Sequence, residues 1–114
     1  MLPLTLLPSK VCVFQQPVDF RKGLDGLSLL VLVAYGPQAA MSGTGFVFFN
    51  RSLAQLKILL FDRHGFWLLL KRLEQGRFSR PSIAELTAAE LSLLLEGVDL
   101  KVRRFASVPP RRVA

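Results

Sequence analysis

Two strongly apolar segments joined by a short polar connection constrain the fold of this chain more than any other feature. Residues 56–61 and 66–73 are rich in leucine and aromatic residues, and residues 62–65 read Asp-Arg-His-Gly. Such a connection favours a β-hairpin, in which Gly65 can take a positive φ. Both predicted strands are apolar on both faces for much of their length. We therefore expect one face to be covered by a helix and the other by further chain or by a second subunit.

Further strands and a long helix are predicted before and after this hairpin. β-branched and aromatic residues predict strands over residues 11–14 and 46–49, and a short strand over residues 77–78. From Arg21, apolar residues recur at three- and four-residue spacing as far as the stop at Gly36-Pro37, which predicts a helix. Additional apolar residues broaden its apolar stripe, so we expect this helix to pack on more than one side.

A second, shorter helix is predicted near the end of the chain. Thr87 followed by Glu90 matches a capping box, so the helix should run over residues 88–96 and stop at Gly97. The predicted fold class is α+β, a small antiparallel sheet with one long and one short helix. We expect a single globular domain over residues 1–100 and a basic C-terminal tail over residues 101–114.

Charge and cysteine content narrow the classes of partner. The chain has 15 Lys and Arg against 8 Asp and Glu, a net charge of +7, which favours anionic partners, nucleic acid first among them. The single cysteine, Cys12, allows no internal disulfide and suggests a reducing compartment. The longest uninterrupted apolar run, residues 29–35, is far shorter than the roughly 20 residues that span a bilayer. We therefore expect a cytoplasmic protein with no membrane partner.

Basic side chains beside turn signals are the candidate binding residues. Asp19 can accept a hydrogen bond from the first turn of the predicted helix, and Arg21 and Lys22 then lie at the positive end of its dipole. A phosphate or an acidic partner would relieve that conflict, although a helix cap followed by two solvated cations explains the same residues. The candidate nucleic-acid-binding residues are Arg21, Lys22, Arg51, Lys57, Lys71, Arg72, Arg77 and Arg80.

Three of these residues have a second interpretation that is equally good. Lys71 and Arg72 are adjacent in a predicted strand, so their side chains point to opposite faces. They can simply be solvated strand ends that discourage edge-to-edge aggregation. Lys57 shares a face with apolar neighbours, and either extends its amine to solvent or marks the boundary of a partner surface.

Aromatic residues close to these cations raise the question of base stacking. Aromatic platforms flanked by Arg and Lys bind unpaired bases in many proteins. Their density within apolar runs nevertheless favours core packing, given how often phenylalanine is buried. This prediction covers Phe46, Phe48, Phe49, Phe66 and Trp67, whereas an exposed Phe78 between Arg77 and Arg80 would be the exception.

No catalytic constellation is evident in the sequence. The one histidine, His64, falls in the predicted hairpin turn, and no base is paired with Cys12 or a serine at a recognisable spacing. A two-metal nuclease needs several acids around ions about 4 Å apart, and the acids here are dispersed along the chain. We therefore predict a non-enzymatic protein with no catalytic residue, no metal site and no cofactor.

Several motifs resemble a known family in their order and spacing. They are Pro17 and Asp19 before Arg21-Lys22-Gly23, then Asp25-Gly26-Leu27; Phe46-Val47-Phe48 before Asn50-Arg51; Leu56-Lys57-Ile58-Leu59 with Asp62 and Gly65; Lys71-Arg72-Leu73-Glu74 with Gly76-Arg77-Phe78 and Pro81; and Leu94-Leu95-Glu96-Gly97 with Asp99. From about Pro3 to about Asp99 the chain resembles the small accessory protein, often called TnpB, of insertion-sequence family sixty-six. That protein is encoded beside the transposase of the element.

The resemblance implies an accessory role in the transposition of a bacterial insertion sequence. The expected partners are element DNA, the transposase or a sister accessory protein. Two alternatives stay open, a protein-interaction subunit that does not touch DNA and a metal-dependent nuclease. A homodimer is a further option, because the doubly apolar hairpin in so short a chain needs cover.

Overall fold

The hairpin is the longest feature of the sheet in the computed structural model, which describes residues 8–100. β3 (Gln55–Asp62) and β4 (Gly65–Arg72) pair antiparallel over their full length, with Asp62 opposite Gly65. The turn between them is only two residues long, Arg63 and His64. Gly65 therefore belongs to the strand, and the positive φ of this turn falls on Arg63, at 52°. The prediction that Gly65 would take the positive φ is wrong for this reason.

Three further strands complete a five-stranded sheet in the order β4-β3-β2-β1-β5. They are β1 (Val11–Val13), β2 (Gly45–Phe49) and β5 (Glu85–Leu86). All neighbouring strands are antiparallel except β1 and β2, which run parallel. A parallel pair needs a crossover connection, and α1 (Leu24–Tyr35) supplies it. The α+β fold class is confirmed, and the sheet is mostly rather than purely antiparallel.

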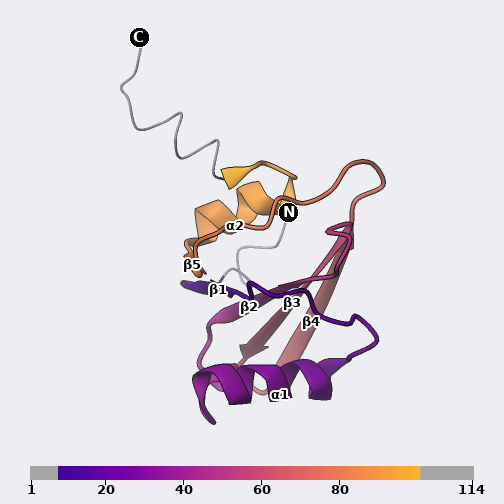
Figure 1. Cartoon of the computed structure of the whole chain (residues 1–114). Helices are drawn as coiled ribbons and strands as arrows, with labels where there is room; N and C mark the ends of the chain where they lie inside the picture. Colours follow the sequence, from indigo (N-terminus) through magenta and orange to yellow (C-terminus); the bar gives the residue numbers. More distant parts are fainter. Residues whose placement is uncertain (1–7, 101–114) are drawn as a thin grey trace.

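The helices cover opposite faces of the sheet (Figure 1). On one face, α1 buries Leu27 and Val31 against a group of side chains that we call the α1-side core; it comprises Cys12, Leu27, Val31, Phe46, Phe48 and Leu59. On the other face, α2 (Ala88–Leu95) packs on the α2-side core, which comprises Val11, Val13, Val47, Phe49, Leu56, Ile58, Phe78, Leu86, Leu91, Leu94, Leu95 and Leu100. Within residues 8–100, no polar or charged residue is buried.

The first helix starts later than its sequence pattern predicts. Its N-cap residue is Gly23, which has no side chain to cap the first turn. Arg21 and Lys22 lie in the turn before it. Asp19 accepts a hydrogen bond from the backbone N–H of Arg21 at 2.9 Å and so stabilises that turn instead of capping the helix. The expectation that α1 packs on more than one side fails in the described part of the chain, because Leu29, Leu32 and Val33 are exposed.

The second helix follows its local signals closely. The Thr87 hydroxyl accepts from the Glu90 N–H at 3.1 Å, and the Glu90 carboxylate accepts from the Thr87 N–H at 2.9 Å. This is the predicted capping box. Gly97 follows the helix with a φ of 85°, as its predicted role as a stop requires.

Two elements near the C-terminal end differ from the sequence expectation. Residues 77–78 form no strand, because Phe78 donates its N–H to the Leu53 carbonyl at 2.7 Å and buries its ring in the α2-side core. The short β5 strand was not predicted, and it pairs Leu86 with Val11. The predicted tail over residues 101–114 lies outside the described residues, and no described helix is long and apolar enough to cross a membrane.

Candidate nucleic-acid interface

The segment between β1 and α1 continues from β1 along β2, packs Phe14, Val18 and Phe20 against the α1-side core, and carries two of the candidate cations. Phe14 donates its N–H to the Val47 carbonyl, and Val18 donates to the Phe49 carbonyl, both at 2.9 Å. These bonds tie the segment along β2. Beyond them, the turn at residues 19–22 closes with a hydrogen bond from the Lys22 N–H to the Asp19 carbonyl at 3.0 Å.

Lys57 fixes this turn to the sheet. Its amine donates to the carbonyls of Phe20 and Lys22, at 2.9 and 3.0 Å, and lies 4.9 Å from the centre of the Phe20 ring. The ammonium group therefore satisfies backbone carbonyls and contacts an aromatic face. Lys57 holds the turn that carries Arg21 and Lys22, which is a structural role that neither sequence interpretation of this residue included.

Arg21 is engaged by Asp19 on the surface of the protein. The guanidinium donates to both carboxylate oxygens, with Nη2 2.7 Å from Oδ2 and Nε 3.2 Å from Oδ1. Hydrogen bonds from the Arg21 side chain and backbone lower the pKa of the Asp19 carboxyl from 3.8 to about 2. The same hydrogen bond and the opposite charge raise the pKa of Arg21. Both groups therefore stay charged in all ordinary buffers.

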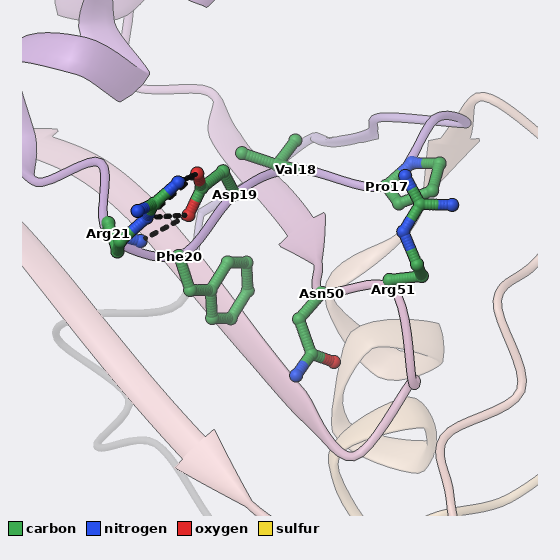
Figure 2. Close-up of a pocket in the computed structure, with 7 residues that line it drawn as sticks. All are labelled: Pro17, Val18, Asp19, Phe20, Arg21, Asn50 and Arg51. Carbon is green, nitrogen blue, oxygen red and sulfur yellow. Dashed lines mark hydrogen bonds and ion pairs between the residues drawn. The ribbon is translucent and has the colours of Figure 1, made fainter.

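An open pocket of about 570 Å³ joins this turn to the β2–β3 connection. Figure 2 shows Arg21 and Asp19 at one side of it and Arg51, which follows the end of β2, at the other. Its lining residues are Pro17, Val18, Asp19, Phe20, Arg21, Asn50 and Arg51. Arg51 has no ion-pair partner within residues 8–100, so its charge is available to an anion. Arg21 and Arg51 lie 30 positions apart in the sequence, and the fold brings them to one pocket.

The two cations at the end of β4 separate onto opposite faces, as their adjacency predicts. Lys71 is opposite Leu56, a member of the α2-side core, so it lies on the α2 face. Arg72 is opposite Gln55, which places it on the α1 face with Lys57. Arg72 also contacts Glu74, with 3.4 Å between Nη2 and Oε2. Arg21, Lys22, Arg51 and Arg72 are thus associated with the α1 face and its loops, and we call them the loop-side basic group.

Arg77 and Arg80 do not line the pocket of Arg21 and Arg51. Both lie in the connection that leads from β4 to the α2 side, where Phe78 is buried between them. Arg77 is exposed and Arg80 is half-buried. Phe78 is therefore buried and is not available to stack on an unpaired base.

The aromatic residues divide between core and surface. Phe46, Phe48 and Phe49 are buried, as predicted. Phe66 and Trp67 are 36% and 44% exposed, so the prediction that they are core residues is wrong. They belong to β4, which forms the edge of the sheet in the described part of the chain. Sequence reasoning also missed Asn50 and Pro17, whose position at the pocket has no signal in the local pattern.

No acidic or metal-ligating centre is found among residues 8–100, where no three His, Cys, Asp or Glu side chains gather closely enough to hold an ion. The described residues thus form a small α+β protein with several exposed cations, two of which line one pocket. It belongs to the family of IS66 Orf2-like proteins, whose family model matches residues 9–105. This match confirms the predicted family and supports a transposition-associated accessory role for the protein, in a family of accessory proteins that are not known enzymes.

Two relatives come from Sinorhizobium fredii (strain NBRC 101917 / NGR234). The uncharacterized protein y4jC is 34% identical over 110 residues, which cover 92% of this chain and 93% of the relative. The uncharacterized protein y4hO is 36% identical over 104 residues, which cover 82% of this chain and 88% of the relative. No solved structure matches the chain.

Proposed function

We propose that this protein assists transposition by binding the phosphates of element DNA in the cytoplasm through its loop-side basic group. The observation that carries the proposal is the pocket shared by Arg21 and Arg51, beside a turn that Lys57 fixes. A fixed turn presents its cations with less loss of side-chain and backbone freedom on binding. Arg51 at the pocket and Arg72 on the same face extend the cationic surface beyond the turn.

Phosphate contact is favoured over reading of base edges. Helices that enter the major groove present polar side chains such as Arg, Asn and Gln to the bases. The outward side of α1 instead presents Leu29, Leu32 and Val33, and the exposed positions of α2 include Ala89. Neither described helix has the character of a recognition helix. The proposed contacts therefore position the protein on DNA without selecting a sequence.

Salt dependence is the first test of this proposal. If about four phosphates are neutralised, the slope of log K against log salt is roughly −3.6 for duplex DNA. Fluorescence anisotropy with labelled element-end DNA and a shuffled duplex would give both the slope and the sequence preference. We expect a steep slope and similar affinities for the two duplexes.

Charge-removing variants test which cations are used. Arg51→Gln should weaken binding and reduce the slope by about 0.9, the contribution of one phosphate contact. Arg63→Gln removes the same charge from the turn at the opposite end of β3, so it is the matched control and should change the slope little. Equal effects of the two variants would contradict a localised site. Absence of binding at low salt would reject the DNA proposal altogether.

A protein-interaction role without DNA contact is the second candidate, and exposed apolar side chains on α1 and β4 favour it. Such surfaces are typical of sites that meet another protein. The transposase or a sister accessory protein is the partner that this candidate requires. The nuclease alternative draws no support from residues 8–100, where no three His, Cys, Asp or Glu side chains gather closely enough to hold a metal ion.

A further inference from the structure

Among residues 8–100, no strand pairs with the outer side of β4, so this edge of the described sheet is open. β4 is eight residues long, and its pairing with β3 runs without a bulge from Gly65 to Arg72. It contains no proline, and its charged residues are confined to its last two positions. The opposite edge, β5, is only two residues long. Natural proteins protect edges by shortness, bulges, proline or charge, and β4 lacks most of these devices.

Alternate residues of β4 turn their backbone groups toward the open edge. The Leu73 N–H donates to the Ala54 carbonyl at 3.0 Å, so position 73 faces β3. Because strand residues alternate, positions 67, 69 and 71 also face β3, and positions 66, 68, 70 and 72 face outward. Each outward residue has an N–H and a C=O directed away from β3.

The side chains at this edge are apolar on both faces of the sheet. Leu70, at 58% exposed, and Phe66 lie on the α1 face, whereas Trp67 lies on the α2 face. Leu68 and Leu69 between them are half-buried and pack against the two cores. A single partner strand would cover apolar side chains on both faces at once.

We propose that the occupant of this edge is β4 of a second copy of the chain, paired antiparallel about a twofold axis at Leu69. This register places outward residues opposite outward residues, Phe66 with the second copy's Arg72 and Leu68 with its Leu70. These pairs exchange both backbone hydrogen bonds. The remaining pairs are Leu69 with itself and Trp67 with Lys71.

Charge and aromatic complementarity support this occupant. The strand begins with Phe66 and Trp67 and ends with Lys71 and Arg72. Antiparallel self-pairing puts each cation of one copy beside an aromatic ring of the other on the same face, where cation–π attraction is favourable. Parallel pairing would instead set cation beside cation. A self-complementary patch of this kind is what a closed twofold interface requires.

The inference rests on the β4 edge and does not require the proposed DNA contact, although Arg72 belongs to both surfaces. A twofold axis through paired strands is perpendicular to the sheet, so both copies present their α1 faces on the same side. If the DNA proposal holds, the dimer therefore offers two loop-side basic groups to one duplex. The oligomeric state is measured without DNA, so failure of either proposal is seen separately.

Sedimentation velocity of the full chain over a concentration series tests the proposal. We expect the unmodified protein to sediment as a dimer and Leu70→Arg to sediment as a monomer. Circular dichroism should show that the Leu70→Arg protein is folded. Leu29→Arg is the matched control, because Leu29 is 56% exposed on α1, and it should remain a dimer. An unmodified protein that stays monomeric at its highest soluble concentration would overturn the inference, as would dissociation by Leu29→Arg alone.

A backbone variant separates strand pairing from side-chain packing. Leu70→Pro removes an N–H that points to the open edge and leaves the bonds to β3 intact, so edge positions of this kind accept proline. We expect a folded monomer. A folded Leu70→Pro protein that still dimerises would contradict pairing through this edge.

Cysteine cross-linking tests the register. Residues that face each other in a non-hydrogen-bonded antiparallel pair have Cα atoms about 4.5 Å apart, within the range of a disulfide. Leu69→Cys should therefore form a disulfide-linked dimer under mild oxidation. Leu70→Cys should not, because the two copies of position 70 are diagonal neighbours about 7–8 Å apart. The native Cys12 is 4% exposed and burial raises the pKa of its thiol, so the unmodified protein should not cross-link. The reverse pattern would reject this register.

Discussion

The Arg21 guanidinium is used by two interactions, the hydrogen bonds to Asp19 that shape the turn and the proposed contact with DNA. Its guanidinium makes a two-point contact with Asp19, and its N–H is held by the same carboxylate. A phosphate that approaches the pocket meets this ion pair and Arg51, which forms no ion pair with any residue between positions 8 and 100. Asp19 therefore both shapes the turn and opposes an incoming anion.

Asp19→Asn separates these two effects. The amide oxygen can still accept from the Arg21 N–H, so the turn should persist, while the negative charge is lost. We expect DNA to bind a few-fold more tightly, with a steeper salt slope, because one more cation becomes available to a phosphate. Anisotropy titrations at several salt concentrations provide the measurement. Weaker binding would instead show that the carboxylate positions Arg21 for DNA.

The Asp19 carboxylate also makes the stability of the native protein depend on pH in the acid range. The folded pKa of Asp19, about 2, lies below the ordinary 3.8, so the carboxylate stabilises the folded state above about pH 3.8. That stabilisation is lost as the pH falls from 3.8 through 2. Unfolding of Asp19→Asn should therefore depend less on pH in this window than unfolding of the native protein.

At the scale of single elements, α2 is specified by its own sequence and β4 is not. The capping box of α2 satisfies two free backbone N–H groups with side chains three residues apart. β4 has the same apolar character as β3, yet β3 is central and β4 is the edge. The exposure of Phe66 and Trp67 follows from that position in the sheet.

The capping box makes a simple prediction about stability. Thr87→Ala removes the acceptor of the Glu90 N–H and should lower the free energy of unfolding by about 1 kcal/mol. Ser92→Ala, inside the same helix, is the control and should have little effect, because alanine is the better helix former. Urea denaturation at constant temperature gives both values. Equal losses for the two variants would argue against the cap.

At the scale of the whole molecule, one sheet is shared by two hydrophobic cores. Ile58 and Leu59 are adjacent in β3 and point to opposite faces, Ile58 into the α2-side core and Leu59 into the α1-side core. Neither core is complete without the sheet, so the described domain should unfold as one unit.

Paired truncations test this arrangement. Ile58→Ala and Leu59→Ala should each cost roughly 2–5 kcal/mol, and each should shift a single transition seen by all probes. Val33→Ala is the control, since that side chain is 79% exposed, and should change the stability by less than about 0.5 kcal/mol. Two separate transitions in either core variant would show that the faces fold independently.

The sequence by itself determined the features that depend on neighbours a few residues apart. Local backbone geometry accounts for the β3–β4 hairpin and for the capping box at Thr87. It also accounts for the helix stops at Gly36 and Gly97 and for the opposite directions of Lys71 and Arg72. Family membership was also recognisable, because the motifs that carry it are read in order along the chain.

Only the tertiary structure decided which strands are neighbours and which cations meet. Contacts between distant segments decide that β1 pairs parallel with β2 and that β5 forms beside β1. They also decide that β4 lies at the edge of the sheet. The pocket of Arg21 and Arg51 and the hydrogen bonds of Lys57 to the turn have the same origin. Periodicity reports which side of an element is apolar, but not which partner covers it, because burial is a property of the packed molecule.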